Sequence, residues 1–134
     1  MNYKIFITKS CRRQGHKLPI DEVDLLRIRR SVLALKYWPD NLDGYDYEKA
    51  FGALEFKFET KNHWVRVFVH FEDERKIAWV FKVIVKKEND LSAYKISIET
   101  AMSQLRVDLE KWKKQQIELE KKSMMTVLKG GQSE

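Results

Sequence analysis

Cysteine is almost absent from this chain: Cys11 is the only one among 134 residues. A single cysteine excludes an internal disulfide and a paired-cysteine metal site, and the three histidines have no spacing typical of zinc ligands. The sequence has no run of about 18 apolar residues that could span a membrane, and no apolar signal-peptide segment follows Met1. We therefore expect a cytoplasmic protein that uses no metal and no cofactor.

The residues that are present fit one folded domain. Hydrophobic residues make up 43% of the chain and aromatic residues 12%, which is enough for a core at this length. Charged residues make up 34%, with a net charge of +6 and a pI near 9.4. Such a basic chain favours an acidic partner, which includes nucleic acid, a membrane surface or an acidic protein.

The first part of the chain predicts one strand and one helix. Residues 3–8 alternate as a strand does, and the basic stretch 9–18 is a connection. A helix is expected over 19–37, between the two prolines, with a wide apolar stripe that indicates burial against a sheet. The turn-rich segment 39–52 predicts a loop with one short helical turn over 47–51.

Residues 53–87 predict three consecutive strands with one apolar face and one charged face. If Lys61 and Asn62 form a two-residue hairpin loop, with Asn62 tolerating a positive φ, Lys57 lies directly opposite Arg66. The apolar pairs of this register are Leu54 with Val69, Phe56 with Val67 and Phe58 with Val65.

The third strand is expected after a reversal at the acidic segment 72–74. A slip of one residue would place Arg66 in the core, so the hydrophobic pattern favours a register with Arg66 beside Val80. In that register Val67 lies by Trp79 and Val65 by Phe81. Two like charges facing each other, Lys57 and Arg66, normally cost stability, and an anion bound on this face would remove that cost.

A final helix is expected from a cap at Asp90 or Ser92. Its apolar stripe consists of Ile98, Met102, Leu105, Leu109 and Trp112. The predicted fold is therefore α+β, an antiparallel sheet with helices packed on one face, in the order strand, helix, three strands, helix, with a possible extra helical turn before the three strands. Residues 1–122 form one domain in this prediction and 123–134 a flexible tail.

The charged strand face combines cations that can bind phosphate with aromatic rings that can stack on bases. The guanidinium of Arg66 suits stabilisation of a phosphorane, and Lys57, with a pKa lowered by Arg66, could exchange protons. The alternative is an ordinary solvated face on which Glu55 and Glu59 neutralise Lys57 and Arg66 diagonally.

Residues 52–87, GALEFKFETKNHWVRVFVHFEDERKIAWVFKVIVKK, resemble the core of the RelE/ParE toxin superfamily, especially its HigB-like, phage-type members. After a glycine, the family pattern has a strand of the type L-x-E-x-(R/K), to which Leu-Glu-Phe-Lys at 54–57 corresponds with one residue fewer between Leu and Glu. A strand with an arginine between apolar residues follows at 64–71, and a strand that ends in a Lys-Lys pair at 80–87. With the preceding strand and helix, the resemblance covers about residues 3–112.

The resemblance implies a RelE-like fold and a toxin of a toxin-antitoxin pair that enters the ribosomal A site, cleaves mRNA without a metal and inhibits translation. Its implied partners are mRNA, the ribosome and a small antitoxin protein of the helix-turn-helix type, with no membrane partner. The catalytic residues expected on this basis are Lys57, Arg66 and Lys82. The expected RNA-binding residues are Trp64, Phe68, His70, Lys86, Lys87 and Tyr94.

Two other functions stay open at this point. The superfamily includes gyrase inhibitors without nuclease activity, so the same face could serve a non-catalytic gyrase inhibitor or phage regulatory protein. Alternatively, the long final helix could be the functional surface instead of the sheet.

Overall fold

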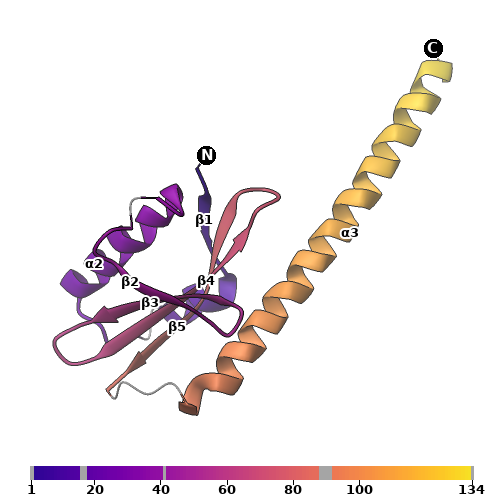
Figure 1. Cartoon of the computed structure of the whole chain (residues 1–134). Helices are drawn as coiled ribbons and strands as arrows, with labels where there is room; N and C mark the ends of the chain where they lie inside the picture. Colours follow the sequence, from indigo (N-terminus) through magenta and orange to yellow (C-terminus); the bar gives the residue numbers. More distant parts are fainter. Residues whose placement is uncertain (1, 16–17, 41, 88–91, 134) are drawn as a thin grey trace. The chain divides into compact units, whose positions relative to one another are not determined.

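The computed structural model describes residues 2–15, 18–40, 42–87 and 92–133 and has an α+β fold with a five-stranded mixed sheet and a long C-terminal helix (Figure 1). Residues 1–102 and 103–134 form two compact units. The elements are β1 (Lys4–Ile7), α1 (Lys9–Gly15), α2 (Glu22–Leu33), the 3-10 helix η1 (Ala34–Tyr37), β2 (Asp46–Ala50), β3 (Ala53–Glu59), β4 (Trp64–Glu72), β5 (Ile77–Lys86), the 3-10 helix η2 (Ser92–Tyr94) and α3 (Lys95–Ser133).

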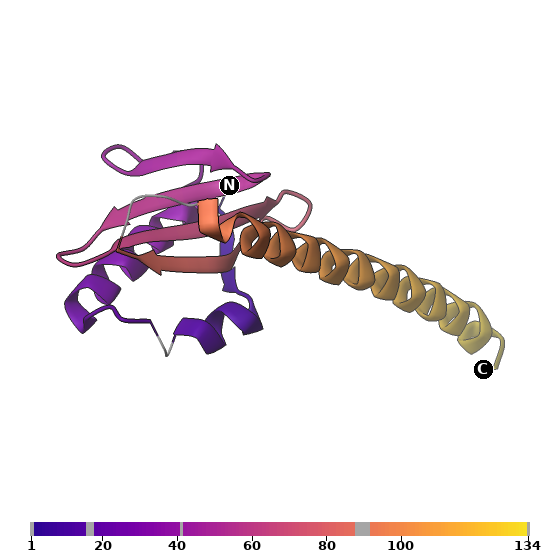
Figure 2. The ribbon, with the colours of Figure 1, turned by 90° about the horizontal axis from the view of Figure 1, so that it is seen from below.

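The strands of the sheet lie in the order β1-β5-β4-β3-β2 (Figure 2). Neighbouring strands from β2 to β5 are antiparallel, as the sequence predicts. The prediction of a wholly antiparallel sheet is wrong for β1, which pairs in parallel with β5. A parallel pair needs a long crossover connection, and here the whole segment from α1 to β4 provides it.

One face of the sheet, here called the α2 face, carries the main hydrophobic core. The strands contribute alternate residues to it, among them Phe56, Val67 and Val80. The helical side contributes Ile28 of α2 and Leu35 of η1. Asp21 caps α2 by accepting a hydrogen bond from the Asp24 amide at 2.9 Å. Helix α2 is followed directly by η1, so helical backbone ends at Tyr37, as the sequence predicts.

The β3–β4 hairpin confirms the predicted register. Lys57 lies opposite Arg66, and the three predicted apolar pairs are present. The amide of Thr60 donates to the carbonyl of His63 at 2.9 Å, which closes the two-residue loop. Neither Lys61 nor Asn62 has a positive φ, so that part of the prediction is wrong. The Thr60 hydroxyl holds the turn instead, because it accepts from the His63 amide at 3.0 Å.

The predicted β4–β5 register is wrong. Arg66 lies opposite Ile84, not Val80. Likewise Val67 pairs with Val83 and Val65 with Val85. Strand β4 continues to Glu72, and the reversal follows at 73–76, where Lys76 has a φ of 56°. A β-bulge then shifts the register between Phe68 and Val69. The later turn shifts the pairs of 69–72 by three residues, an odd number, so Val80 lies in the core of the α2 face and Trp79, predicted on the apolar face, lies opposite His70. The extra bulged residue makes the shift four for 64–68, so Val83 and Val85 keep the predicted face.

Two elements differ from the sequence-based expectation. Residues 46–50 form the edge strand β2 where a helical turn was predicted, and the described part of 9–18 contains helix α1. Strand β2 joins β3 through Phe51 and Gly52, which have φ values of 54° and 76°. Positive φ at both central residues is the geometry of a type I′ hairpin turn, and glycine adopts it without steric cost.

The face opposite the α2 face is also partly buried. Phe68 and Ile84 are buried on it. Ile98 and Met102, from the first turns of α3, are buried too and belong to the same compact unit. Ser92 lies in η2, whereas Asp90, the other predicted cap, lies outside the described residues.

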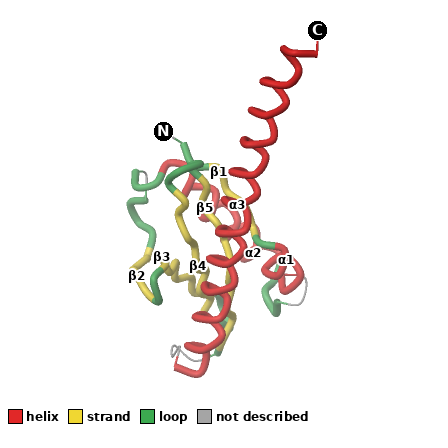
Figure 3. The backbone as a smooth tube through the Cα atoms, turned by 90° about the vertical axis from the view of Figure 1, so that its right-hand side faces the viewer, coloured by secondary structure: helices red, strands yellow, loops and turns green. Residues whose placement is uncertain are grey.

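The second compact unit consists of the continuous helical part of α3 over 103–133 (Figure 3). Helical backbone therefore extends beyond residue 122, where a tail was predicted to begin. Several of its apolar side chains are exposed, including Ile117, Leu119 and Met124. Within the described part of the chain, no helix has the length and apolar character needed to cross a lipid bilayer.

Candidate functional site

Four charged residues on the face opposite α2 form a charge cluster: Glu48 from β2, Glu55 and Lys57 from β3, and Arg66 from β4. Their positions follow from strand pairing, which places Glu48 opposite Glu55 and Lys57 opposite Arg66. Each of these two cross-strand pairs places like charges directly opposite each other, which is unfavourable. The side chains therefore pair diagonally, cation to carboxylate.

The inner pair of the charge cluster is buried. Arg66 Nε lies 3.0 Å from Glu55 Oε1, and the two residues are 3% and 1% exposed. The guanidinium carbon of Arg66 lies 5.5 Å from the centroid of the Trp64 ring. A buried ion pair with a cation-π contact restrains Arg66 strongly.

The outer pair is open to solvent. Lys57 Nζ lies 2.8 Å from Glu48 Oε1, with the Lys57 side chain 27% exposed. The hydrogen bond to Glu48 raises the pKa of Lys57 and outweighs the opposite effect of partial burial. The prediction of a lowered Lys57 pKa is therefore wrong, because the hydrogen bond to Glu48 and the charges of Glu48, Glu55 and Asp46 raise the pKa. At neutral pH Lys57 is a cation and cannot act as a base.

Burial raises the pKa of Glu55, although the charge of Arg66 opposes that effect. The charges of Lys57 and Lys86 also act on Glu55. Lys86 is buried at 6% exposure and lies opposite Trp64, at the end of β5. The structure thus gathers three predicted site cations, Lys57, Arg66 and Lys86, around one buried carboxyl group.

Two predicted site residues stand apart from the charge cluster. Lys82 follows the bulge in β5, and its charge acts on Cys11, whose pKa is raised to about 11, chiefly by burial. Lys82 is not among the charged groups that affect the pKa of Glu55. Phe68 is fully buried and packs against Phe51 and Phe81 with ring centroids 6.2 and 6.4 Å away. Phe68 is a core residue in this structure and offers no face to a base.

The other predicted RNA-binding residues are scattered. Trp64 is half-buried beside the charge cluster, and Lys87 is exposed just beyond β5. His70 faces Trp79, and its charge contributes to the lowered pKa of Glu72 at the opposite end of β4. Tyr94 is half-buried in η2. Of this group, the structure brings only Trp64 and Lys86 together with Lys57 and Arg66.

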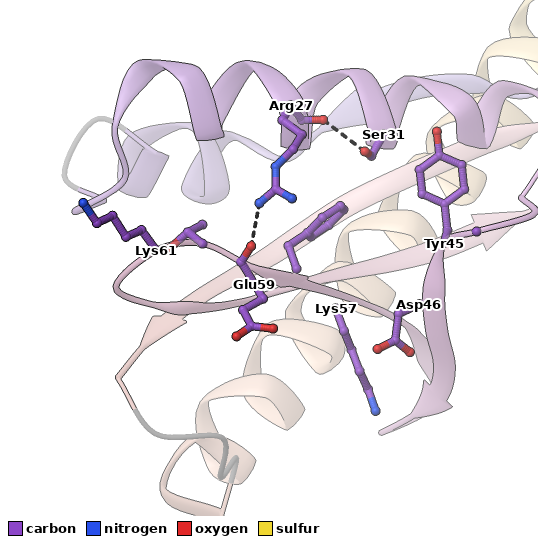
Figure 4. Close-up of a pocket in the computed structure, with 10 residues that line it drawn as sticks. Arg27, Ser31, Tyr45, Asp46, Lys57, Glu59 and Lys61 are labelled. Atoms are coloured by element: carbon purple, nitrogen blue, oxygen red, sulfur yellow. Dashed lines mark hydrogen bonds between the residues drawn. The ribbon is translucent and has the colours of Figure 1, made fainter.

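An open pocket of about 650 Å³ adjoins the charge cluster at the sheet edge (Figure 4). Its lining residues are Arg27, Ser31, Gly44, Tyr45, Asp46, Lys57, Phe58, Glu59, Thr60 and Lys61. Strand β2 begins at Asp46, opposite Lys57, so the end of β3 continues past its neighbour and leaves a gap. Arg27 of α2 closes part of that gap by donating to the Glu59 carbonyl at 2.6 Å.

Several of these residues were missed from the sequence. Glu48 was assigned to a loop, although tyrosines and acidic residues alternate over 45–48 in the period-two pattern of a strand. Arg27 belongs to a basic helix surface, and no sequence signal indicates that it reaches the end of β3. Among the described residues, no group of three histidine, cysteine or acidic side chains is placed to hold a metal ion.

A second ion pair lies at the far end of β4. Arg75 donates from Nε and Nη2 to the two carboxylate oxygens of Glu72, and Trp79 Nε1 lies 3.4 Å from Glu72 Oε1. Burial would raise the pKa of Glu72, but the hydrogen bonds and charge of Arg75 outweigh it, so the pKa is lowered. A lowered pKa stabilises the fold above the unfolded value of 4.5, and this stabilisation is lost as the pH falls through the folded value.

We expect Arg75→Gln to lower the free energy of unfolding by about 1–3 kcal/mol at about pH 7, because Glu72 loses its charged hydrogen bonds. The difference from the wild type should shrink as the pH falls through the folded pKa of Glu72, because the carboxylate then takes up a proton in both proteins. Urea unfolding over a series of pH values below about 7 measures the difference. Arg29→Gln, on the exposed surface of α2, is the control. A difference in the free energy of unfolding between Arg75→Gln and the wild type that stays constant with pH would contradict this role for Arg75.

Comparison with known proteins adds no further constraint on this site. No model of a protein family matches the chain, and no curated protein matches it.

Proposed function

We propose that this chain is a ribosome-dependent endoribonuclease that cleaves mRNA without a metal, the toxin of a toxin-antitoxin pair, and that its α+β sheet corresponds to the RelE-like fold. The observation that carries the proposal is the direct pairing of Lys57 with Arg66, with the Trp64 ring against the guanidinium. The net charge of +6 and the sequence resemblance support it. The site of action would be the cytoplasm, where ribosomes are found.

The exposure of the charge cluster assigns different tasks to its two cations. Lys57 is within reach of solvent and can exchange Glu48 for a phosphate oxygen of the RNA. As a cation it can stabilise the extra negative charge of the phosphorane or protonate the leaving oxygen. Arg66 lies behind it, held by Glu55, so we assign it a positioning role. An antitoxin would inhibit the enzyme by covering Lys57.

Induced expression of the chain in a bacterial host is the direct test. Growth should stop within one generation, and mapping of mRNA ends should show cuts within translated codons that disappear when translation is blocked beforehand. A matched strain expressing Lys57→Gln should continue to grow. Normal growth with intact mRNA at a confirmed protein level would count decisively against the nuclease.

A specific observation favours a second candidate, a non-catalytic binding protein such as a gyrase inhibitor or phage regulatory protein. Lys57 and Arg66 each have a carboxylate within 3.0 Å, so the four-residue charge cluster is electrically neutral. A neutral cluster can serve as structure alone. Growth arrest with intact mRNA, relieved by a resistant gyrase, would support this candidate over the nuclease.

A further inference from the structure

The sheet-edge pocket presents two different sides. Figure 4 shows the side chains of Asp46, Lys57 and Glu59 pointing away from α2, toward the face that carries the charge cluster. Arg27, Ser31 and Tyr45 lie on the α2 side. Both carboxylates that line the pocket, those of Asp46 and Glu59, are therefore directed away from α2. We call the part of the pocket on the α2 side the α2-side pocket.

Three hydrogen-bond donors are available to an anion in the α2-side pocket. Arg27 contributes a guanidinium, of which Nη2 bonds the Glu59 carbonyl, leaving other N–H groups. Lys61 is exposed and forms no ion pair within the described parts of the chain. The nearest acidic group to Arg27 is Asp24, whose Oδ1 lies 3.6 Å away, a loose contact on the surface of α2.

The backbone of β3 adds the third donor. Thr60 directs its amide to His63, just before β4, and alternate residues of a strand direct their backbone groups to opposite neighbours. The amide of Glu59 therefore points toward the edge of β3 where β2 would lie. The pairing of β2 with β3 begins at Asp46 and Lys57, so β2 does not reach Glu59. Gly44, with a φ of 85°, also lines the pocket.

Aromatic surface completes the α2-side pocket. Tyr45 is half-buried, so its ring is partly open to the pocket, whereas the Phe58 ring is 9% exposed and belongs to the buried wall of the pocket. Ser31 and Thr60 line the same pocket, with their hydroxyl groups donating to the carbonyls of Arg27 and His63. Cations with a backbone amide suit a phosphate, and an open tyrosine ring suits a base. Together they fit a nucleotide.

We propose that the α2-side pocket binds one nucleotide of a single-stranded RNA, with its phosphate against Arg27, Lys61 and the Glu59 amide and its base against Tyr45. This inference rests on the proposed function, because Lys57 lines the same pocket and would contact the neighbouring, scissile phosphate. The pocket would then fix the register of the RNA on the charge cluster. A bound nucleotide beside the reacting phosphate orients the bond to be cut.

The test uses the purified full chain and adenosine 5′-monophosphate, followed by two-dimensional amide NMR. We expect saturable shifts at Gly44, Glu59 and Lys61 but not in β1. Arg27→Gln and Lys61→Gln should each weaken binding about tenfold, because each removes one charged contact to the phosphate. The matched controls Arg29→Gln and Lys49→Gln remove exposed charges that do not line the pocket and should leave binding unchanged.

Inorganic phosphate provides the second arm. It should bind about tenfold more weakly than the nucleotide, because it lacks the stacking contribution of the base. Equal affinity for both ligands, absence of saturable shifts, or equal binding by Lys61→Gln and wild type would overturn the proposal. The Lys61 variant keeps the test valid even if Arg27→Gln disturbs the bond to Glu59.

The two proposals fail differently. If the nucleotide binds as expected while expression of the chain leaves mRNA intact, the nucleotide pocket stands and the nuclease is wrong. If an Arg27→Gln, Lys61→Gln double variant cuts mRNA at the wild-type rate and at the same codon positions, the pocket has no part in RNA recognition and the nuclease stands.

Discussion

Replacing Arg66 with alanine should lower the free energy of unfolding by about 3–5 kcal/mol, because it leaves the buried carboxylate of Glu55 without its ion-pair partner. Such a loss is a large share of the roughly 5–15 kcal/mol that stabilises a typical domain. Urea unfolding followed by tryptophan fluorescence measures the effect. The double variant Glu55→Leu, Arg66→Met should recover most of the loss, because an apolar pair of similar volume removes both buried charges.

Lys57→Ala serves as the control for Arg66. Its partner Glu48 is exposed and water can solvate the carboxylate once the lysine is gone, so stability should change far less. Equal losses for the two single variants would contradict the division into a buried inner pair and an open outer pair. The expected instability also means that inactivity of Arg66→Ala would say nothing about catalysis.

The β3–β4 hairpin shows what a sequence can predict. Its apolar residues alternate on both strands, which decides the buried face, and the two-residue loop at 61–62 then selects one register among those that keep this face buried. Local periodicity and a short turn were sufficient there. The pairing of Lys57 with Arg66, on which the functional proposal rests, was predicted in this way.

The β4–β5 register was predicted wrongly because the same rule has more than one solution there. For the pairs of 64–68 the register differs from the prediction by four residues, and an even shift keeps the same faces buried, so alternation cannot separate these two registers. The position of the turn decides among them, and the turn is set by Lys76 with its positive φ and by the hydrogen bond from the Tyr3 hydroxyl to Asp73 at 2.5 Å. The bulge after Phe68 adds a further shift that periodicity does not encode.

The sequence indicated the partner of one site cation, Arg66, but not the partner of the other, Lys57. Glu55 was considered as a neutralising group and does pair with Arg66, since both are on the central strands. Lys57 pairs with Glu48 instead of Glu59, because β2 adds an edge strand that was taken for a loop. A missed edge strand thus changes the electrostatics of the site while leaving its core pattern intact.

Lys57→Gln should reduce mRNA cleavage on purified ribosomes by about 10²–10³-fold, the usual effect of removing one group that stabilises transition-state charge. The fold should persist, because the side chain is 27% exposed and its partner is a surface carboxylate. Lys49→Gln, an exposed lysine on neighbouring β2, removes the same charge and should cleave at the wild-type rate. Single-turnover rates separate this effect from weaker ribosome binding.

The pH dependence then distinguishes the role of Lys57. Because Glu48 raises its pKa above 10.5, the ammonium stays charged through the physiological range. Cleavage that depends on a cationic Lys57 should therefore not increase as this residue deprotonates, and Lys57→Arg should retain part of the activity. If lysine were the base, the rate would rise toward its pKa and arginine would not replace it. Full activity of Lys57→Gln would instead remove this residue from the chemistry and leave the charge cluster a structural feature of the sheet.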